Sequence, residues 1–394
     1  MSSSIRQGVI ECALLGYVLM VVALLTLSPF RFEWPPVWKI AWWGDVGDAP
    51  ANALLYLPVG YFLRLARPRA TTRSVLYALL FGAALGVATE TLQLFLPDRL
   101  SSLSDACGNA LGSAAGAVLC GAVRRRFERT LPAVLTLEHP LLNLVYLTVP
   151  LMWLTGVGVE ADPARVWLLA PLGAIGAVTL TGLWRYRFKI AADLPRPALA
   201  LAVMAWFVFG AVTGLAHAPL VVAQCALGIF TLTLILLYLR RPASNPERRF
   251  ERKVLAGVWP FFFIYLVLLV WCPLPMPFAP FDFAFGYPEV IFERDFTLRI
   301  AEQLGALTLL GYLLAESFGR SFAPARQLFL RNLLRCAMWA LLLELAHGLV
   351  PGDRASFVRW LLGCASAGFG VLLYATQLSV LRMMLSGQQS APRS

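Results

Sequence analysis

Long apolar runs separated by short polar segments make up almost the whole chain. Stretches such as "VLMVVALLTL" and "LGIFTLTLILLYL" lie in runs of roughly 17 to 21 residues, long enough as α-helix to cross about 30 Å of hydrocarbon. The pattern predicts an all-α, polytopic membrane helix bundle of about twelve transmembrane helices. The expected spans are 9–28, 50–66, 75–95, 105–123, 140–158, 165–184, 198–216, 219–239, 254–273, 300–316, 332–350 and 356–376.

The composition identifies the bilayer as the solvent for most side chains. Of the 394 residues, 59% are hydrophobic and 14% are charged, and the mean hydropathy is +0.70. A soluble domain of this length needs far more charged surface. The first apolar run continues into "SPFRFEWPP" without a small-residue cleavage motif, so we expect a retained helix and not a removed signal peptide.

The basic residues predict the orientation in the membrane. If the amino terminus is cytoplasmic, the connections on that side carry "RLARPRATTR", "RRRFER", "RYRFK", "RRPASNPERRFERK" and "RSFAPARQLFLRNLLR". Basic loops remain in the cytoplasm, so both termini are expected there. The net charge of +11 is then explained by topology and anionic inner-leaflet lipids. Nucleic acid is not an expected partner, because no basic patch is interleaved with exposed aromatic residues.

An internal repeat relates the two ends of the chain. "NALLYLPVGYFLRLA" is similar to "EQLGALTLLGYLLAE", and "ATETLQLFLPDRLSS" is similar to "LLLELAHGLVPGDRAS". This alignment matches Glu90 with Glu344 and Gln93 with His347. Arg354 lies in "VPGDRAS", the segment of the second copy that matches "LPDRLSS" of the first. Each copy has four helices that begin on the same side, which predicts parallel repeats in a 4+4+4 arrangement. The expected modules are 1–126, 127–241 and 242–394, and the third has lost part of the polar set.

Polar residues of the first copy converge on one end of three expected helices. Asp45, Asp48 and Asn52 share one face of the second helix by their spacing of three and four. Glu90 and Gln93 lie near the end of the third, Arg99 lies in the turn, and Asp105 and Asn109 open the fourth. Some of these side chains suit helix capping. The set nevertheless exceeds what two caps need, and intramembrane ionisable residues usually mark a site. We therefore expect a binding pocket at the outer leaflet.

Two stripes of small residues accompany this polar set. Gly82 and Gly86 lie on the third expected helix, and Gly108, Gly112 and Gly116 lie on the fourth. Glycines four residues apart let helix backbones approach closely in lipid. Because a short turn joins the two helices, we expect the two stripes to face each other.

These motifs resemble the VanZ-like family of bacterial membrane proteins. The resemblance rests on an Asn–Pro–Gly helix (Asn52, Pro58, Gly60), a Glu-x-x-Gln helix end, an Arg–Ser turn, and an Asp-x-x-x-Asn opening to a Gly-rich helix. It covers about residues 9–123, and residues 254–376 resemble the family in outline only. The resemblance implies a place in the bacterial inner membrane and an association with the cell envelope. It also implies the associations of that family, which are glycopeptide (teicoplanin) resistance and a location of some members beside surface-polysaccharide genes.

Other chemistry has weaker support. His139, His217 and His347 are far apart and the seven cysteines are scattered, so no metal site and no disulfide framework is expected. No Gly-x-Ser-x-Gly elbow or phosphate loop is present. We expect no cofactor, although a divalent cation is an alternative ligand for the carboxylates.

Three functions remain open from the sequence. The first is binding of an envelope lipid or lipid-linked glycan (a polyprenyl phosphate, for example), with Arg99 on phosphate and carboxylates on sugar hydroxyls. The second is an extracytoplasmic hydrolase or transferase that uses Glu90 and Asp105 as acid and base. The third is a secondary transporter. We expect binding and not catalysis, with membrane lipids and other envelope-assembly proteins as partners.

Overall fold

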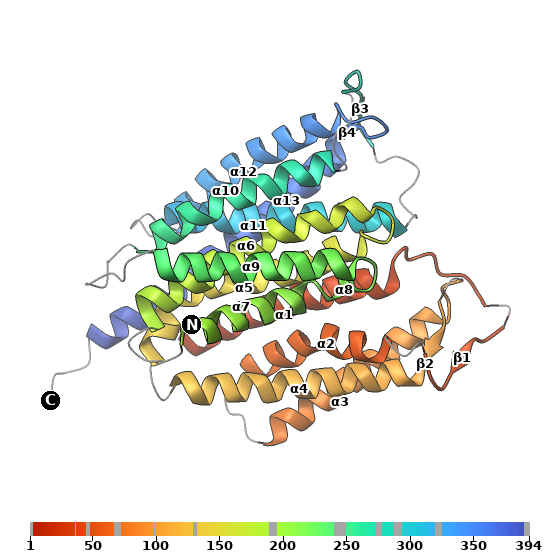
Figure 1. The fold of residues 1–394 in the computed structure, drawn as a ribbon, viewed down its shortest axis with the longest axis horizontal. Coiled ribbons are helices and arrows are strands. Elements are labelled where there is room, and N and C mark those ends of the chain that lie inside the picture. The colour runs from red at the N-terminus through yellow and green to blue at the C-terminus, as the bar shows by residue number, and fades with distance from the viewer. Residues whose placement is uncertain are drawn as a thin grey trace. The chain divides into compact units, whose positions relative to one another are not determined.

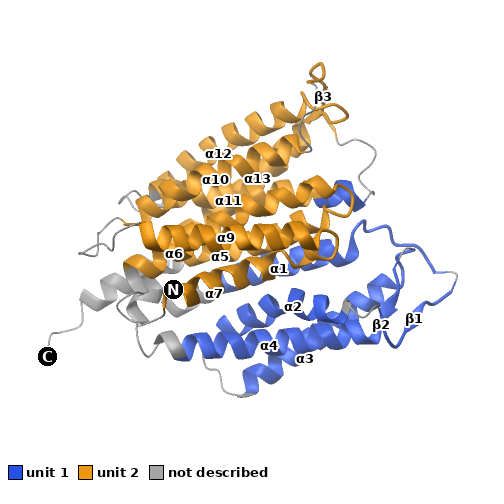
Figure 2. Cartoon of the chain, in the orientation of Figure 1, with its two compact units in different colours: residues 1–132, 292–298, 383–394 blue, residues 133–291, 299–382 orange. Residues whose placement is uncertain are grey.

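The protein is helical throughout the residues described by the computed structural model (Figure 1). Those residues are 3–35, 37–44, 48–66, 72–97, 99–128, 132–188, 195–239, 250–272, 278–286, 294–319 and 325–389. Every span expected from the apolar pattern overlaps an α-helix, although 165–184 begins in a 3-10 turn and 198–216 falls on two helices, Arg196–Gly210 and Val212–Leu215. Contacts divide the chain into two compact units, which Figure 2 colours separately: unit 1 is Met1–Pro132, Phe292–Leu298 and Met383–Ser394, and unit 2 is Ala133–Ile291 and Arg299–Arg382. The expected division into three modules stays a prediction.

Unit 1 contains the first four long helices and one short strand pair. The elements are α1 (Ser3–Leu27), β1 (Ile40–Ala41), α2 (Asp48–Leu65), α3 (Thr72–Gln93), β2 (Ser101–Ser102) and α4 (Leu103–Glu128). β1 pairs with β2 in parallel, with Ile40 opposite Ser101 and Ala41 opposite Ser102. This pairing ties the segment after α1 to the residues that begin α4, at one end of α3 and α4 (Figure 1).

Unit 2 contains the remaining helices. They are α5 (Pro132–Val157), a 3-10 turn η1 (Pro163–Leu168), α6 (Leu169–Leu183), a π-helical turn η2 (Trp184–Phe188), α7 (Arg196–Gly210), α8 (Val212–Leu215), α9 (Pro219–Leu239), α10 (Phe250–Trp271), β3 (Phe283–Ala284), α11 (Arg294–Gly319), α12 (Ala325–His347), β4 (Ala355–Ser356) and α13 (Phe357–Gln389). The first residues of α11 and the last of α13 fall in unit 1. β3 pairs with β4 in parallel, with Phe283 opposite Ala355 and Ala284 opposite Ser356.

Within the described residues, nine helical segments are long and apolar enough to cross a membrane. They comprise α1, α3, α4, α5, α6 with its flanking turns, α9, α10, α11 and α13. α7 is apolar but shorter, and α2 and α12 fall outside this group. α12 begins at Ala325 and not at 332, so it includes Arg326 and Arg331 as well as Glu344, and these charges lower its mean hydropathy.

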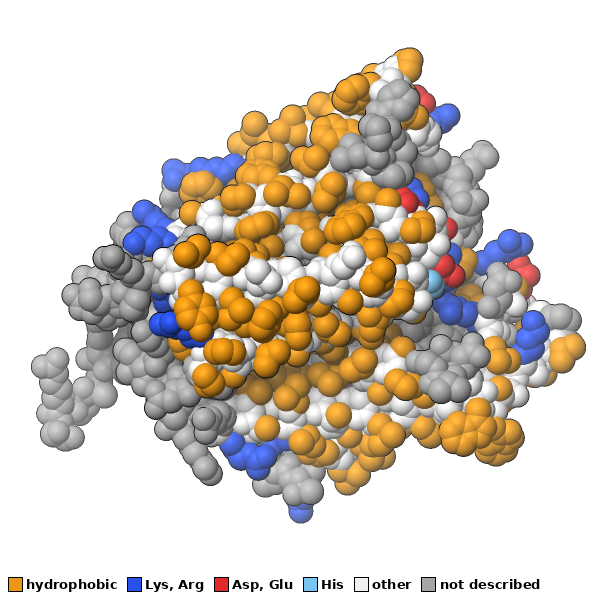
Figure 3. Space-filling view, viewed as in Figure 1, with side chains coloured by type: hydrophobic (Ala, Val, Ile, Leu, Met, Phe, Trp, Pro, Cys, Tyr) orange, Lys and Arg blue, Asp and Glu red, His pale blue; other side chains and the backbone are white. Residues whose placement is uncertain are grey.

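The outward surface of the helices is apolar, as expected for contact with lipid. Leu220 and Leu227 of α9 are 72% and 63% exposed, and Leu334 and Met338 of α12 are 67% and 60% exposed. In Figure 3, hydrophobic side chains cover the helix faces that are in view, while charged side chains lie toward helix ends. Such a surface is far too apolar for a water-soluble protein of this size.

Glycines bring α2 and α4 into close contact. A Cβ atom on Gly108 would lie 2.6 Å from the carbonyl oxygen of Ala49, and Cβ atoms on Gly112 and Gly116 would overlap the carbonyl oxygens of Ala53 and Leu57. The glycine stripe of α4 therefore packs on α2. Gly82 and Gly86 of α3 instead approach α4 at Ser113 and Asn109. The expectation that the two stripes face each other was wrong, because α4 uses separate faces for its two neighbours.

Candidate functional site

The polar residues of α3 and α4 meet beside the strand pair of unit 1. Glu90 is buried near the end of α3, and its Oε2 accepts a hydrogen bond from the backbone N–H of Ser102 at 2.7 Å. The Ser102 hydroxyl in turn accepts a 3.3 Å hydrogen bond from the backbone N–H of Asp105. One serine therefore links the third helix to the first turn of the fourth. Glu90, Ser102, Asp105 and Asn109 are called the seam cluster below.

Asp105 completes the acidic part of the seam cluster. Its side chain is 8% exposed, like that of Glu90, and its charge and that of Arg99 both act on Glu90. Gly44 lies close by: its N–H donates to the Ser104 hydroxyl at 3.0 Å, and a Cβ there would be 3.4 Å from the Asp105 carboxylate. Gly44, three residues after β1, thus lies against Ser104 and Asp105 and has no side chain of its own there.

Asn109 lies one turn deeper than Asp105 on the same face of α4. Its side chain is 2% exposed, a Cβ on Gly86 would be 3.1 Å from its Nδ2, and its buried Oδ1 has no hydrogen-bond partner among the described residues. Ser113, one further turn down, is fully buried, and its Oγ likewise has no hydrogen-bond partner within the part of the chain that the structure describes. Nearby, the Tyr56 hydroxyl of α2 contacts the Thr89 hydroxyl of α3 at 3.2 Å. The polar groups therefore continue inward along α4.

The remaining expected site residues differ in their surroundings. Gln93 is turned toward α1, where its Nε2 donates to the carbonyl oxygen of Thr26 at 3.1 Å. Arg99 and Asn52 are partly exposed. Asp45 lies outside the described residues, and so does the side chain of Asp48, whose backbone begins α2. The structure thus brings Glu90, Asp105 and Asn109 together and places Gln93 in a helix-to-helix contact.

Unit 2 contains a turn with the same hydrogen bonds. Glu344 near the end of α12 accepts from the backbone N–H of Ser356 at 2.8 Å, and the Ser356 hydroxyl accepts from the backbone N–H of Arg359 at 3.3 Å. Gln303 of α11 donates to the other oxygen of Glu344 at 3.4 Å. The close contacts recur as well, since a Cβ on Gly311 or Gly370 would overlap a carbonyl oxygen of the facing helix.

Arg359 distinguishes this second turn from the first. Its Nε lies 2.7 Å from Glu344 Oε1, its Nη1 lies 3.2 Å from Asp353 Oδ1, and its Nη2 donates to the carbonyl oxygen of Arg354. His347, which the alignment matched with Gln93, contacts Asp353 at 2.7 Å. The Arg354 side chain is largely exposed and pairs with Asp282. The guanidinium of Arg359 thus neutralises the buried carboxylate of Glu344.

Asp353 lies in the turn outside the spans, and its pKa is perturbed by these neighbours. Burial alone would raise the pKa, but the hydrogen bond and charge of His347, together with the Arg359 guanidinium, lower it from about 3.8 to about 2. The carboxylate is therefore held in its charged form over the whole physiological range.

Sequence reasoning missed a second buried polar network in unit 2. Arg165 of η1 forms an ion pair with Glu302 of α11, and both are almost fully buried. Thr155 donates to Glu302 at 2.6 Å and Tyr265 donates to it at 3.2 Å. A signal was available, because Arg165 and Glu302 both fall inside expected spans, but 137 residues separate the two partners and nothing in the sequence pairs them.

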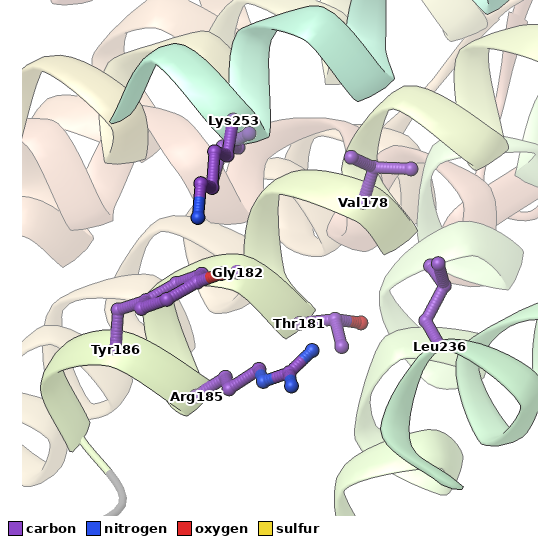
Figure 4. A pocket seen from close by; sticks show the side chains of 8 residues that line it. Val178, Thr181, Gly182, Arg185, Tyr186, Leu236 and Lys253 are labelled. Atoms are coloured by element: carbon purple, nitrogen blue, oxygen red, sulfur yellow. The ribbon is translucent and has the colours of Figure 1, made fainter. Parts of the chain in front are cut away.

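A small cavity lies elsewhere in unit 2, among α6, η2, α9 and α10 (Figure 4). It is lined by Val178, Thr181, Gly182, Arg185, Tyr186, Leu236, Lys253 and Val254. Two of these side chains, Arg185 and Lys253, are cationic, so this cavity has the opposite charge from the seam cluster.

The helices, their apolar exposed faces and the buried polar clusters define a multi-pass α-helical membrane protein. Residues 10–124 match the model of the VanZ/LLP1 family, so the chain carries a VanZ/LLP1 domain that comprises α1 to α4. The recognition from sequence is confirmed for this part of the chain. The comparisons with curated proteins and with solved structures found no match.

Proposed function

We propose that the VanZ/LLP1 domain binds the polar head group of an envelope lipid or lipid-linked glycan at the seam cluster. The observation that carries this proposal is the pair of buried carboxylates, Glu90 and Asp105, held on adjacent helices by Ser102. Ionisable side chains buried near the ends of membrane-spanning helices usually mark a functional site. Arg99, partly exposed at the same end, is suited to a phosphate, while the acceptor groups suit hydroxyl or amino donors.

The site is proposed to face the periplasm of a bacterial inner membrane. This orientation follows from basic loops on the opposite side and agrees with the cationic cavity at Arg185 and Lys253, since Arg185 follows α6 and Lys253 begins α10. The full proposal has twelve spans, with α2, α7 and α12 crossing alongside the nine apolar ones. α12 supports this reading, because its exposed side chains form an apolar stripe despite its charges.

The recurring hydrogen bonds support a parallel internal repeat. α1 to α4 correspond to α10 to α13, with Glu90 matched to Glu344, Ser102 to Ser356, and β1–β2 to β3–β4. α5 to α9 then form a central module. Such a protein would act in surface-polysaccharide assembly or in glycopeptide resistance, alone or with other envelope-assembly proteins.

A binding assay tests the head-group site. The purified protein in nanodiscs should retain a polyprenyl-phosphate-linked sugar, and retention should fall in both Arg99→Ala and Asp105→Ala. Arg354→Ala, an exposed arginine of the second turn, is the matched control and should bind like wild type. Unchanged retention in both site variants would remove the pocket from consideration.

The closeness of the two carboxylates also supports an enzymatic alternative. A general acid and base pair needs two titratable groups in different environments, and Glu90 and Asp105 interact electrostatically. Hydrolysis or transfer on a lipid-linked substrate by the purified protein, lost in Glu90→Gln, would favour catalysis. Retention of substrate without turnover would favour binding alone. Proton-coupled uptake into proteoliposomes would instead indicate a transporter.

A further inference from the structure

The segment between α1 and α2 exposes a dense set of tryptophan side chains. Four of them are more than half exposed: Trp34 (78%), Trp38 (51%), Trp42 (78%) and Trp43 (82%). These four residues are called the aromatic edge below. Contiguous exposed apolar side chains mark a surface at which a protein meets another molecule or a membrane. The aromatic edge is therefore a candidate contact surface of unit 1.

Backbone hydrogen bonds hold the aromatic edge at one end of α3 and α4, where β1 pairs with β2 (Figure 1). The N–H of Ser101 donates to the carbonyl oxygen of Lys39 at 3.3 Å, and the N–H of Ser104 donates to that of Trp42 at 3.2 Å. Gly44, which follows Trp43, donates its own N–H to the Ser104 hydroxyl. The two ends of the strand pair are thus fixed to the residues that begin α4.

A ring cluster fixes the other half of the aromatic edge. The Phe95 ring, just after α3, lies 5.7 Å from the Trp34 ring and 5.8 Å from the Trp38 ring, and the two indoles lie 5.9 Å apart. The N–H of Glu33 also donates to the carbonyl oxygen of Phe95 at 2.8 Å. The exposed rings therefore stand on a fixed support, and their exposure is a property of the fold.

Neither water nor hydrocarbon suits this segment. An indole ring is large and apolar and carries one N–H donor, so it gains from a medium that is apolar on one side and wet on the other. Hydrocarbon is excluded as the medium because the backbone here is irregular and the segment carries exposed charges at Arg31, Glu33 and Lys39. The lipid head-group layer meets both demands, and tryptophan is enriched there in membrane proteins.

The lipid-facing surface of the helices continues into the aromatic edge. The segment begins directly after α1, whose apolar span ends at Leu27, and it pairs with residues directly before α4, whose apolar span begins at Leu103. Leu100 and Leu103, on either side of β2, are both exposed. An apolar surface that runs from the spans to the strand pair without a break points to lipid as its partner.

Exposed aromatic rings recur at the strand pair of unit 2. Phe278 and Phe285 of the segment that carries β3 are 75% and 76% exposed, and Phe357 follows β4 and is exposed as well. The rings differ between the two units, since tryptophan is replaced by phenylalanine. A protein partner selects particular rings by the shape of its pockets, whereas a fluid lipid layer accepts either kind.

We propose that the aromatic edge docks in the lipid head-group layer at the end of unit 1 that carries the seam cluster. Gly44 lies against Ser104 and Asp105 directly after Trp43, so the seam cluster then lies at the depth of the head groups. Polar atoms of the lipids themselves are in reach there, without a path through hydrocarbon. The inference does not depend on which ligand the seam cluster binds.

Tryptophan fluorescence measures the depth of the aromatic edge. Full-length protein is placed in vesicles of phosphatidylcholine that carries bromine either near the head group or near the chain ends, and acrylamide is added as the quencher in water. The chain has 12 tryptophans, so the signal of the edge is the difference between wild type and a four-Phe variant, Trp34→Phe, Trp38→Phe, Trp42→Phe and Trp43→Phe. Bromine near the head group should quench this signal roughly twofold more strongly than bromine near the chain ends.

Three further variants serve as controls. Trp43→Phe alone repeats the comparison at the most exposed ring, where folding is least affected. Trp153→Phe removes a fully buried ring of unit 2 and should remove fluorescence that bromine quenches weakly from either position. Phe285→Trp in the four-Phe variant should restore quenching by bromine near the head group, and quenching of that new ring from water alone would count against the proposal.

Three results would overturn the inference. Quenching of the edge by acrylamide as strong as that of free tryptophan, with little effect of bromine, would place the rings in water. Strongest quenching by bromine near the chain ends would place them in hydrocarbon. Protection from both quenchers would show that protein covers the rings, whether from this chain or from a second copy.

Discussion

Glu90 and Ser102 are joined by a 2.7 Å hydrogen bond from a backbone N–H to a buried carboxylate. The bond fixes the end of α3 against the residues that begin α4, and Glu344 makes the same bond to Ser356 in unit 2. A glutamate that satisfies a buried backbone donor has a structural role whatever ligand it also contacts. Substitutions at Glu90 must therefore separate folding from binding.

Glu90→Ala should destabilise the protein by about 1–3 kcal/mol, because the buried N–H of Ser102 loses its acceptor. Glu90→Gln keeps a carbonyl oxygen at this position and should cost less than about 1 kcal/mol. Thermal unfolding in detergent, followed by tryptophan fluorescence, measures the difference. Equal melting temperatures for the two variants would show that the hydrogen bond contributes little to stability.

Gly112→Ala should disrupt the packing of α2 on α4, since the new methyl group would overlap the carbonyl oxygen of Ala53. The expected loss is about 1–3 kcal/mol or more, because a backbone atom and not a flexible side chain must move. Gly16→Ala is the control: the glycine lies in α1 with nothing within 4 Å of its added Cβ. That variant should be as stable as wild type or slightly more so, and a melting temperature similar for both alanines would contradict the packing argument.

Glu302→Gln should destabilise unit 2 by about 3–5 kcal/mol, because it leaves the buried Arg165 guanidinium without a countercharge. The double variant Arg165→Met with Glu302→Gln removes both charges and should recover much of this loss. Thr155→Val, which removes only one hydrogen bond to Glu302, should cost about 1 kcal/mol. A double-mutant cycle on melting temperatures checks the coupling, and purely additive effects would count against it.

Asp353 should make the stability of the second turn depend on pH in a narrow acidic window. Its pKa is lowered from about 3.8 to about 2, so its contribution is complete above about pH 4 and is lost as the pH falls toward 2. After allowance for partial exposure of the side chain, this amounts to about 1–2 kcal/mol. The melting temperatures of wild type and Asp353→Asn should differ at pH 6 and converge near pH 2. A constant difference across this range would exclude the ion pairs as its source.

The apolar pattern was sufficient to place every long helix, because hydrocarbon thickness sets span length and leaves few alternatives. The grouping of Glu90, Asp105 and Asn109 could likewise be inferred, since a short turn joins α3 to α4. The partner of the α4 glycines could not, because helices in lipid are apolar on all sides and periodicity does not distinguish one neighbour from another. The two-residue strands are too short to leave any periodic signal.

Arg359 shows a different limit of sequence reasoning. In the aligned sequences Arg359 occupies the position that matches Asp105, which suggested that the third module has lost part of the polar set. In the structure its side chain makes three polar contacts. The role of a charged side chain such as Arg359 depends on which groups surround it in the folded protein. Alignment reveals the exchange of residues, and only the fold reveals the contacts of the new side chain.

The parallel pairing of β1 with β2 has a consequence for biogenesis. The tryptophan-rich segment after α1 leaves the ribosome before α2 and α3, yet its pairing partner is synthesised only after both. The pairing of β1 with β2 must therefore wait until α2 and α3 have been made and the chain has reached Ser102. A nascent chain arrested before Ser101 would then remain sensitive to protease at the Trp-rich segment, and protection would begin only once α4 has been made.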